Sequence, residues 1–348
     1  MTHPRIGFAC QYRHPDRTLT ASELKLIEGP FNPRTTTLRW LDGVAPGVAH
    51  DKLVEIIRHN LAAQLRLLAF VAQLPPTLHM LRLSSDLLPF YSHPKVAAFY
   101  QDPAIQRMLE EGFAAIGEAA RAARAADIRL SFHPGQFCVL GSDNPGVVEN
   151  SLAEFEYHAD MIRMMGYGRR FQDLKCNVHI AGRLGVAGTR AVWLRLSEVA
   201  RNCITFENDE KTYGLDDCLQ MADLAPVVLD IHHLWIHEGD YIAPDAPRVQ
   251  RVIDSWRGVR PTMHYSQPQE QLQEQGFDAG HKLLIPALLK QMPKRDLYAH
   301  SDQMWNLWTN AYAAQFLARF DIMLEAKHKN VATQAFYEQV VTGAAQPG

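Results

Sequence analysis

Apolar, strand-like segments of this chain end again and again in a histidine, an aspartate or a glutamate. The segments are LSFH, CNVH, ITFE, VVLDIHH, PTMH and IMLE, and their terminal polar residues are His133, His179, Glu207, Asp230 with His233, His264 and Glu325. One such residue would mean little, but six strand ends of this kind predict side chains that converge on one opening. A (β/α)8 barrel builds its active site in this way, at the carboxyl ends of its strands. Because imidazole and carboxylate together suit Mn, Zn, Fe or Co better than Ca or Mg, the pattern predicts a metal site.

Strand candidates alternate with helical stretches for nearly the whole length of the chain, which is typical of parallel βαβ units. Strands are predicted near residues 5–10, 78–84, 128–133, 174–181, 203–207, 226–231, 260–265 and 320–326. Amphipathic helical stretches lie between them, at residues 50–74, 104–126, 147–166 and 302–318. We therefore expect the α/β class: a single (β/α)8 TIM-barrel domain over residues 1–340, followed by a disordered tail at 341–348.

Two stretches interrupt this alternation. Residues 11–48 are rich in Arg, Thr and Pro, and residues 266–300 hold a Gln-rich patch followed by a short helix-like run. Both follow predicted strands, so they are expected to be long loops on the C-terminal face of the barrel. Loops in that place usually bind substrate, and an insertion without such a role is the alternative.

Composition narrows the function classes. The net charge of −3 is not typical of a protein that coats nucleic acid, although a local basic rim is compatible with it. No apolar run approaches the roughly 18 residues of a membrane span, and the first residues do not resemble a signal peptide. The five cysteines form no CxxC and are expected to be free thiols in the cytoplasm. No GxGxxG or P-loop follows a predicted strand, so no nucleotide cofactor is expected.

Local sequence suggests roles for further residues around the opening. Pro and Gly directly after His133 turn the chain away from the sheet and expose the imidazole, whereas the alternative is a core histidine bonded to the backbone. Glu325 emerges after a run of apolar residues and could bridge two ions. Arg82, Lys327 and Lys329 lie near the opening, where they could hold phosphates or simply be solvated rim charges.

Ten blocks of the sequence, taken in order, resemble those of the UV damage endonucleases, the UvsE or UVDE family. The blocks are RIGFACQ, RLSSDLLPFYSHP, LSFHPGQF, VVENSLAEFEYHADMI, VHIAG, FENDE, VVLDIHH, MHYSQ, AHSD and MLEAKHK, and they cover nearly the whole chain except the two long loops. The resemblance implies a (β/α)8 barrel that holds two or three divalent ions in a deep pocket. Manganese is the expected metal, with Zn, Co, Mg or Fe as alternatives. It also implies cleavage of the phosphodiester immediately 5′ to a UV photoproduct.

The resemblance also implies roles for individual residues. The family's metal ligands fall on His93, His133, His179, Glu207, Asp230, His233, His264, His300 and Glu325. His93 and His300 gain this role from the resemblance, since alone they would pass for a surface histidine and a helix cap. Gln136 and Phe137 fall where the family inserts a pair of side chains into the duplex, a wedge that replaces lost stacking.

The chain departs from the family pattern at three positions. Some members carry a lysine two residues before the histidine of the seventh strand, and that lysine can be carboxylated to help hold metal. Here the position is Thr262, which cannot be modified in this way and leaves the third ion or its affinity in question. Phe8 and Tyr12 stand where the family often has Tyr and Asn, and we expect both to contact substrate.

These observations predict a metal-dependent endonuclease that acts, as a monomer, on damaged double-stranded DNA. Glu207 and Glu325 are the expected catalytic carboxylates, and Lys327 or Lys329 would stabilise the added negative charge. The alternative is a small-molecule metalloenzyme on the same barrel, either a sugar isomerase or an iron oxygenase with several histidine ligands. A catalytically silent DNA-damage binder is a third, less favoured reading.

Overall fold

Eight parallel strands form the centre of the computed structural model, which describes residues 3–123, 127–135 and 138–343. Their bounds are β1 (Ile6–Ala9), β2 (Met80–Arg82), β3 (Arg129–Phe132), β4 (Lys175–His179), β5 (Ile204–Glu207), β6 (Val227–Val228), β7 (Thr262–Tyr265) and β8 (Asp321–Leu324). They are hydrogen-bonded in the order β6-β5-β4-β3-β2-β1-β8-β7. The two ends of this order meet, because Asp230 bridges to His264 and the His264 N–H donates to the Leu229 carbonyl at 3.0 Å. The predicted (β/α)8 barrel is confirmed, and each predicted strand range contains an observed strand.

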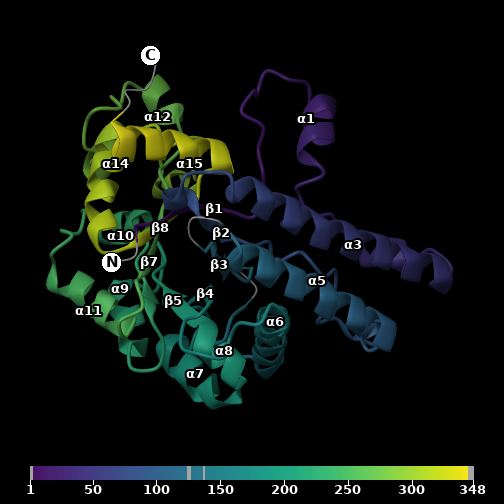
Figure 1. The fold of residues 1–348 in the computed structure, drawn as a ribbon. Coiled ribbons are helices and arrows are strands. Elements are labelled where there is room, and N and C mark those ends of the chain that lie inside the picture. Colours follow the sequence, from purple (N-terminus) through teal and green to yellow (C-terminus); the bar gives the residue numbers. More distant parts are fainter. Residues whose placement is uncertain (1–2, 124–126, 136–137, 344–348) are drawn as a thin grey trace.

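Helices surround the strands (Figure 1). Their bounds are α1 (Ala21–Glu28), α2 (Leu38–Asp42), α3 (Pro46–Val71), α4 (Ala97–Tyr100), α5 (Pro103–Arg121), α6 (Pro145–Met164), α7 (Gly185–Val192), α8 (Glu198–Cys203), α9 (Leu215–Cys218), α10 (Ile231–Glu238), α11 (Pro247–Ser255), α12 (Gln271–Glu274), α13 (Ile285–Leu288), α14 (Leu307–Ala314) and α15 (Lys329–Tyr337). The helices α3, α5, α6 and α11 each begin with proline, whose fixed φ and missing N–H suit the first helical position. In Figure 1, α3 and α5 lie side by side along one flank of the barrel.

One predicted helix was placed too early. The sequence favours a helix over 302–318, but α14 begins only at Leu307. Asn306 is its N-cap, and the backbone N–H of Asn306 donates a hydrogen bond to Gln267 Oε1 at 2.8 Å. This contact with the segment after β7 keeps residues 302–306 out of the helix.

Side chains along each strand alternate between the barrel interior and the helix layer, as the two-residue period of a strand requires. On β4, Cys176 and Val178 belong to the apolar core that packs against the helices. Lys175, Asn177 and His179 point the other way and make polar contacts inside the barrel. This alternation places polar groups on one face of a chain segment whose other face is apolar.

Both predicted long loops contain helices, which the sequence suggested only for the short helix-like run of the second loop. Residues 11–48 include α1 and α2, and the buried Glu28 ties this segment together through ion pairs with Arg13 and Arg17. Residues 266–300 include α12, α13 and the 3-10 turn η5 (Lys294–Tyr298). This second insertion has an apolar cluster of its own, formed by Trp235, Ile236, Leu272, Leu283, Ile285, Leu288, Leu297 and Trp305. Both segments follow the carboxyl end of a strand, as predicted.

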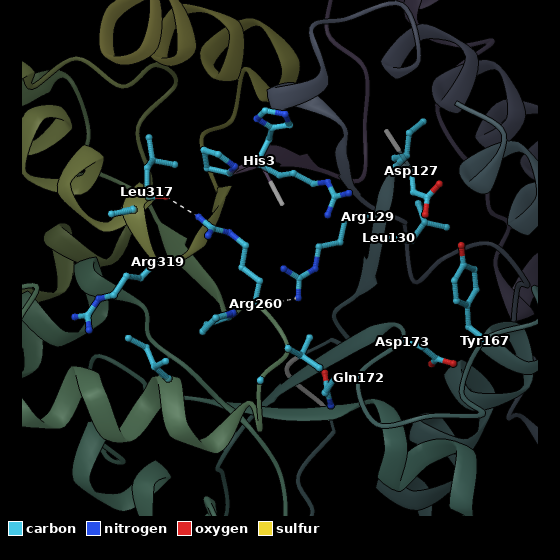
Figure 2. A pocket seen from close by; sticks show the side chains of 18 of the residues that line it. His3, Asp127, Arg129, Leu130, Tyr167, Gln172, Asp173, Arg260, Leu317 and Arg319 are labelled. Carbon is cyan, nitrogen blue, oxygen red and sulfur yellow. Dashed lines mark hydrogen bonds between the residues drawn. The ribbon is translucent and has the colours of Figure 1, made fainter. Parts of the chain in front are cut away.

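The opposite end of the barrel is closed by an ion network. Asp321, at the start of β8, accepts from Arg129 at 2.6 Å and from Arg260 at 2.7 Å. A cavity of about 1380 Å³ lies there, and Figure 2 shows Arg129 and Arg260 among its lining residues. Although it is larger than the cavity at the strand carboxyl ends, this face of such barrels generally serves stability rather than chemistry.

Two sequence expectations concern the chain as a whole. All five cysteines are free thiols, and Cys138, Cys176, Cys203 and Cys218 are buried. Among the helices of the described ranges, none combines the length and the apolar character that crossing a membrane requires.

The buried His158 on α6 makes stability depend on pH. Burial lowers the pKa of His158 from 6.5 to about 4, and its ring contacts Ser85 Oγ at 2.9 Å. Below pH 6.5 the unfolded chain therefore takes up a proton that the folded chain refuses, so this contribution to stability is lost as the pH falls toward 4. We compare the free energy of unfolding of the wild type with that of His158→Gln. The difference between the two should shrink by roughly 2 kcal/mol from pH 7.5 to pH 5.

Urea unfolding at the two pH values measures this difference. A gap that stays constant between the two pH values would show that the folded chain does not resist protonation of His158.

Candidate metal centre

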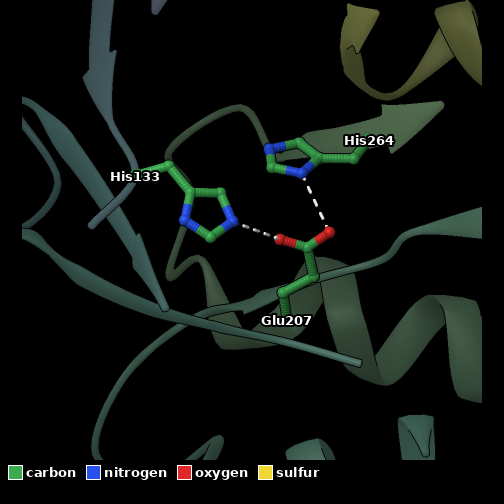
Figure 3. Close-up of side chains that lie close together, drawn as sticks. All are labelled: His133, Glu207 and His264. Carbon is green, nitrogen blue, oxygen red and sulfur yellow. Dashed lines mark hydrogen bonds and ion pairs between the residues drawn. The ribbon is translucent and has the colours of Figure 1, made fainter. Parts of the chain in front are cut away.

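Seven of the predicted ligands converge at the carboxyl ends of the strands, around Glu207. This carboxylate is 1% exposed and lies at the end of β5. Its Oε1 is 2.9 Å from His264 Nδ1, and its Oε2 is 3.3 Å from His133 Nε2 (Figure 3). Two further imidazoles approach from β4 and α10: His179 Nε2 at 3.8 Å from Oε2 and His233 Nδ1 at 3.7 Å from Oε1.

Three overlapping groups have ligand atoms within 4.8 Å of one another. They are His133, Glu207 and His264; His179, Glu207 and His233; and Asp230, His264 and Glu325. Glu207 belongs to two groups: its Oε1 is nearest His264 and His233, and its Oε2 is nearest His133 and His179, one of each pair. A carboxylate shared in this way is what a site for two or more ions requires.

The DxxH spacing at the end of β6 has a local cause. Asp230 is the N-cap of α10, and its Oδ1 accepts from the backbone N–H groups of His232 and His233. The other oxygen, Oδ2, is buried and has no hydrogen-bond partner among the described residues. It lies 3.7 Å from His233 Nδ1. His232 points elsewhere, with its Nε2 3.1 Å from the Leu297 carbonyl.

Electrostatics keep the cluster in a form that suits metal binding. Burial alone would raise the pKa of Glu207, but the neighbouring His264 and His179 hold it well below its usual range. Burial lowers the pKa of His264 to about 4 and also lowers that of His179, so both rings are neutral near pH 7. Burial raises the pKa of Asp230, and the nearby Glu207 and Glu325 raise it further. His233 differs: burial would lower its pKa, but Asp230 and Glu207 raise it to about 9. Crowded, buried carboxylates of this kind fit a divalent cation, since the ion would supply positive charge in place of such a proton.

Glu325 is also paired with an arginine. It follows β8 and forms a buried ion pair with Arg82, whose side chain is only 13% exposed. Glu325 Oε1 lies 3.3 Å from His264 Nδ1. Burial raises the pKa of Glu325, but Arg82 and His264 outweigh this and hold it well below its usual range. Arg82 therefore contacts a candidate ligand from inside the barrel and is not a solvated rim charge.

The two histidines that the resemblance added lie in different places. His300 lines the cavity at the cluster, with its Nδ1 2.9 Å from the Glu325 carbonyl and 3.9 Å from Glu325 Oε2. His93 instead caps the 3-10 turn η2 (Pro94–Val96), where its Nδ1 accepts from the Lys95 N–H at 3.2 Å. His93 is not among the described residues that line the cavity.

A cavity of about 450 Å³ opens over the cluster. His133, His179, His233, His300 and Glu325 form its floor. The loop after β5 and the 266–300 insertion form its wall, where Lys211 Nζ lies 4.8 Å from the centre of the Tyr298 ring. Its volume falls within the usual range for a site that binds a small organic group.

The expected substrate contacts are only partly in reach of this cavity. Phe8 is 1% exposed because its place on β1 alternates with the interior-facing Gly7 and Ala9, so its ring packs in the core behind the sheet. Tyr12 packs against Phe31, with ring centres 4.7 Å apart. Neither ring therefore faces the cluster. Gln136 and Phe137 lie outside the described residues.

The two candidate lysines differ in their surroundings. Lys327 is exposed, and its Nζ lies 3.8 Å from Asp302. Lys329 is largely buried, which lowers its pKa, and its surroundings include Arg82 and Glu325. Lys329 thus lies closer to the cluster than the rim position that its sequence suggests.

Sequence reasoning missed two polar residues beneath the cluster. Lys175 Nζ is 2.7 Å from His264 Nε2, and burial lowers the pKa of Lys175 to about 7. The Asn177 amide donates to Glu207 Oε2 and accepts from Thr205 Oγ1 at 2.8 Å. Both residues precede His179 at two-residue intervals, so extending the strand period back from His179 would have found them.

Comparisons with known proteins agree with one another. Residues 8–341 match the sequence model of a family described as UV-endonuclease UvdE. A UV-damage endonuclease of Neurospora crassa is 31% identical over 55% of this chain, although the match spans only 30% of that protein. A UV DNA damage endonuclease of Bacillus velezensis is 30% identical over 64% of this chain and 68% of the relative, and one of Halalkalibacterium halodurans is 27% identical over 91% and 86%. The solved structure of SacUVDE shares the fold, with a TM-score of 0.69 and 22% identity over 97% of this chain and 99% of that one.

Replacing Arg82 should have opposite effects on stability and on metal affinity. Arg82→Met leaves a buried carboxylate without its cation, which should lower the free energy of unfolding by roughly 3–5 kcal/mol in metal-free protein. The same change removes a charge that competes with a metal ion, so affinity for Mn²⁺ should rise about tenfold or more. Chemical denaturation with a chelator and calorimetric titration with Mn²⁺ measure the two effects.

Arg195→Met is the matched control, because Arg195 forms an exposed pair with Glu149 and both quantities should stay unchanged. Weaker Mn²⁺ binding in Arg82→Met would contradict the idea that Arg82 and the metal compete for Glu325.

Proposed function

The chain belongs to the UV-endonuclease UvdE family, and from this premise we propose a metal-dependent DNA-repair endonuclease that nicks duplex DNA 5′ to UV photoproducts. The observation that carries the proposal is the Glu207-centred cluster, which lies at the open end of the barrel and within the matched residues. Its partner would be damaged double-stranded DNA, bound by a monomer in the cytoplasm.

The proposed cofactor is two or three divalent ions, with Mn²⁺ as the first candidate and Zn²⁺, Co²⁺, Mg²⁺ or Fe²⁺ as alternatives. The ligands would be His133, His179, Glu207, Asp230, His233, His264 and Glu325, with His300 beside them. Asp230 Oδ2 and His179 Nδ1 have no hydrogen-bond partner among the residues that the structure describes, which supports this assignment because buried polar atoms normally have partners. Divalent ions in such a site activate water and neutralise charge on a phosphate. His93 would join only after a rearrangement of the turn that it caps.

The protein side chains would bind and orient the phosphate. Arg82, which is paired with Glu325 in the metal-free site, would be one cation beside the phosphate, and Lys329 would face the phosphate from the first turn of α15. Lys327, on the exposed rim, would contact the DNA backbone further out. Because phosphate contacts of this kind are electrostatic, binding should weaken as salt rises.

The small-molecule alternative is not favoured. A sugar isomerase or an iron oxygenase could use similar ligands, but the family match runs through every strand from β1 to β8. The wedge at Gln136 and Phe137 remains part of the proposal on sequence grounds alone.

A nicking assay tests the proposal. The substrate is an end-labelled duplex with one cyclobutane dimer, and an undamaged duplex of the same sequence is run beside it. With Mn²⁺ we expect one cut immediately 5′ to the dimer, no cut in the undamaged duplex, and no cut after chelation. Glu325→Gln should lower the rate by at least about 100-fold, since it removes a charged group of the site.

Glu149→Gln on the surface of α6 makes the same chemical change away from the site and should cut like the wild type. Cutting that is equal on damaged and undamaged duplex would contradict the proposed specificity. Full activity of Glu325→Gln would contradict the proposed site.

A further inference from the structure

A buried lysine contacts the metal cluster from below. Lys175, the first residue of β4, is 2% exposed, and its Nζ lies 2.7 Å from His264 Nε2. The contact crosses the barrel interior, because β4 and β7 are not neighbours in the sheet. Within the described ranges, no carboxylate oxygen lies within 4.0 Å of this Nζ. A lysine buried without a direct ion-pair partner is costly, so its position calls for a function.

The two nitrogens of the His264 ring have different partners. Nδ1 faces the cluster, 2.9 Å from Glu207 Oε1 and 3.3 Å from Glu325 Oε1. Nε2 faces away from it and is occupied by Lys175. A histidine that binds metal through one ring nitrogen generally holds the other in a hydrogen bond, which fixes both the tautomer and the ring orientation.

We propose that Lys175 is a positioning residue that holds the His264 ring so that Nδ1, and not Nε2, binds the metal ion. This inference rests on the proposed metal site. When Nδ1 donates its lone pair to the ion, Nε2 keeps the ring proton, and this N–H donates a hydrogen bond to the lone pair of the Lys175 amine. The usual partner for this second nitrogen is a carboxylate or a carbonyl, so an amine in this place distinguishes the chain.

Lys175 is the hydrogen-bond partner of His264 Nε2, and the neighbouring side chains do not replace it. Ser131 pairs with Lys175 in register, and Thr262 lies two residues before His264 on the same face of β7. Both hydroxyl oxygens are buried, and neither has a hydrogen-bond partner in the described part of the chain. They line the same interior, but neither takes over the contact with the ring.

Zinc binding to Lys175→Met tests the inference. Methionine keeps the length and volume of the side chain and removes the hydrogen bond. We expect Zn²⁺ affinity to fall by about 10- to 100-fold, the usual loss when such an outer partner is removed. Lys175→Gln restores a hydrogen-bonding group and should recover part of the affinity, and Thr262→Val, a change in the same interior, should bind Zn²⁺ like the wild type.

Nitrogen NMR of the His264 ring in zinc-loaded protein reads the geometry directly. In the wild type we expect zinc on Nδ1 and a protonated, hydrogen-bonded Nε2, and in Lys175→Met a loss of the hydrogen-bonded Nε2 signal. Thermal unfolding with a chelator separates positioning from plain structural support. Without metal, Lys175→Met should be close to the wild type in stability, because the loss of a costly buried amine offsets the Nε2 that it leaves without a partner.

Each contrary outcome has a distinct meaning. Zinc on Nε2 in the wild type, or wild-type zinc affinity in Lys175→Met, would overturn the positioning role and leave the metal site intact. Lower metal-free stability with an unchanged zinc affinity would make Lys175 a structural residue only. If the wild type bound no zinc and no Mn²⁺, both the inference and the metal part of the proposed function would fail together.

Discussion

A carboxylate buried among four imidazoles is the interaction on which the rest of this structure depends. Glu207 has almost no exposed surface, and His133, His179, His233 and His264 all lie within 4 Å of its oxygens. Taking such a charge out of water is expensive unless its partners are fixed. The barrel fixes them, because parallel strands that end at one level bring residues from distant parts of the chain to a single point.

The barrel interior holds polar groups at every level, which is unusual for a packed core, beside one small apolar cluster of Ala9, Met80 and Met323. The Arg129–Asp321–Arg260 network closes one end, Lys175 and Asn177 occupy the middle, and the Glu207-centred cluster occupies the open end. Most apolar packing is therefore left to the outer face of each strand, where residues such as Phe132, Cys176 and Phe206 meet the helices. The fold is stabilised mainly between sheet and helices, and the interior remains available for chemistry.

Sequence reasoning succeeded where a signal was local. Apolar runs located all eight strands, and the polar residues at the ends of six of these runs are the seven side chains that converge, because strand direction and the two-residue period are properties of short segments. The helix α1 was missed although Thr20 and Glu23 form a capping box that the sequence displays. The Arg82–Glu325 pair, the inward Lys329 and the separate place of His93 could not be predicted, since they depend on packing between residues far apart in the chain. Phe8 was misplaced because its sequence position gives no sign of which strand face it takes.

Anomalous diffraction from crystals soaked in Mn²⁺ would test the Glu207 centre most directly. The cluster predicts at least two manganese peaks, each within bonding distance of Glu207 or Glu325 and of at least one of His133, His179, His233 and His264, with Lys175 still in contact with His264 Nε2. Crystals that show no manganese at these residues, while the imidazoles keep their contacts with Glu207 unchanged, would contradict it, because protons and Arg82 would then balance the buried charges.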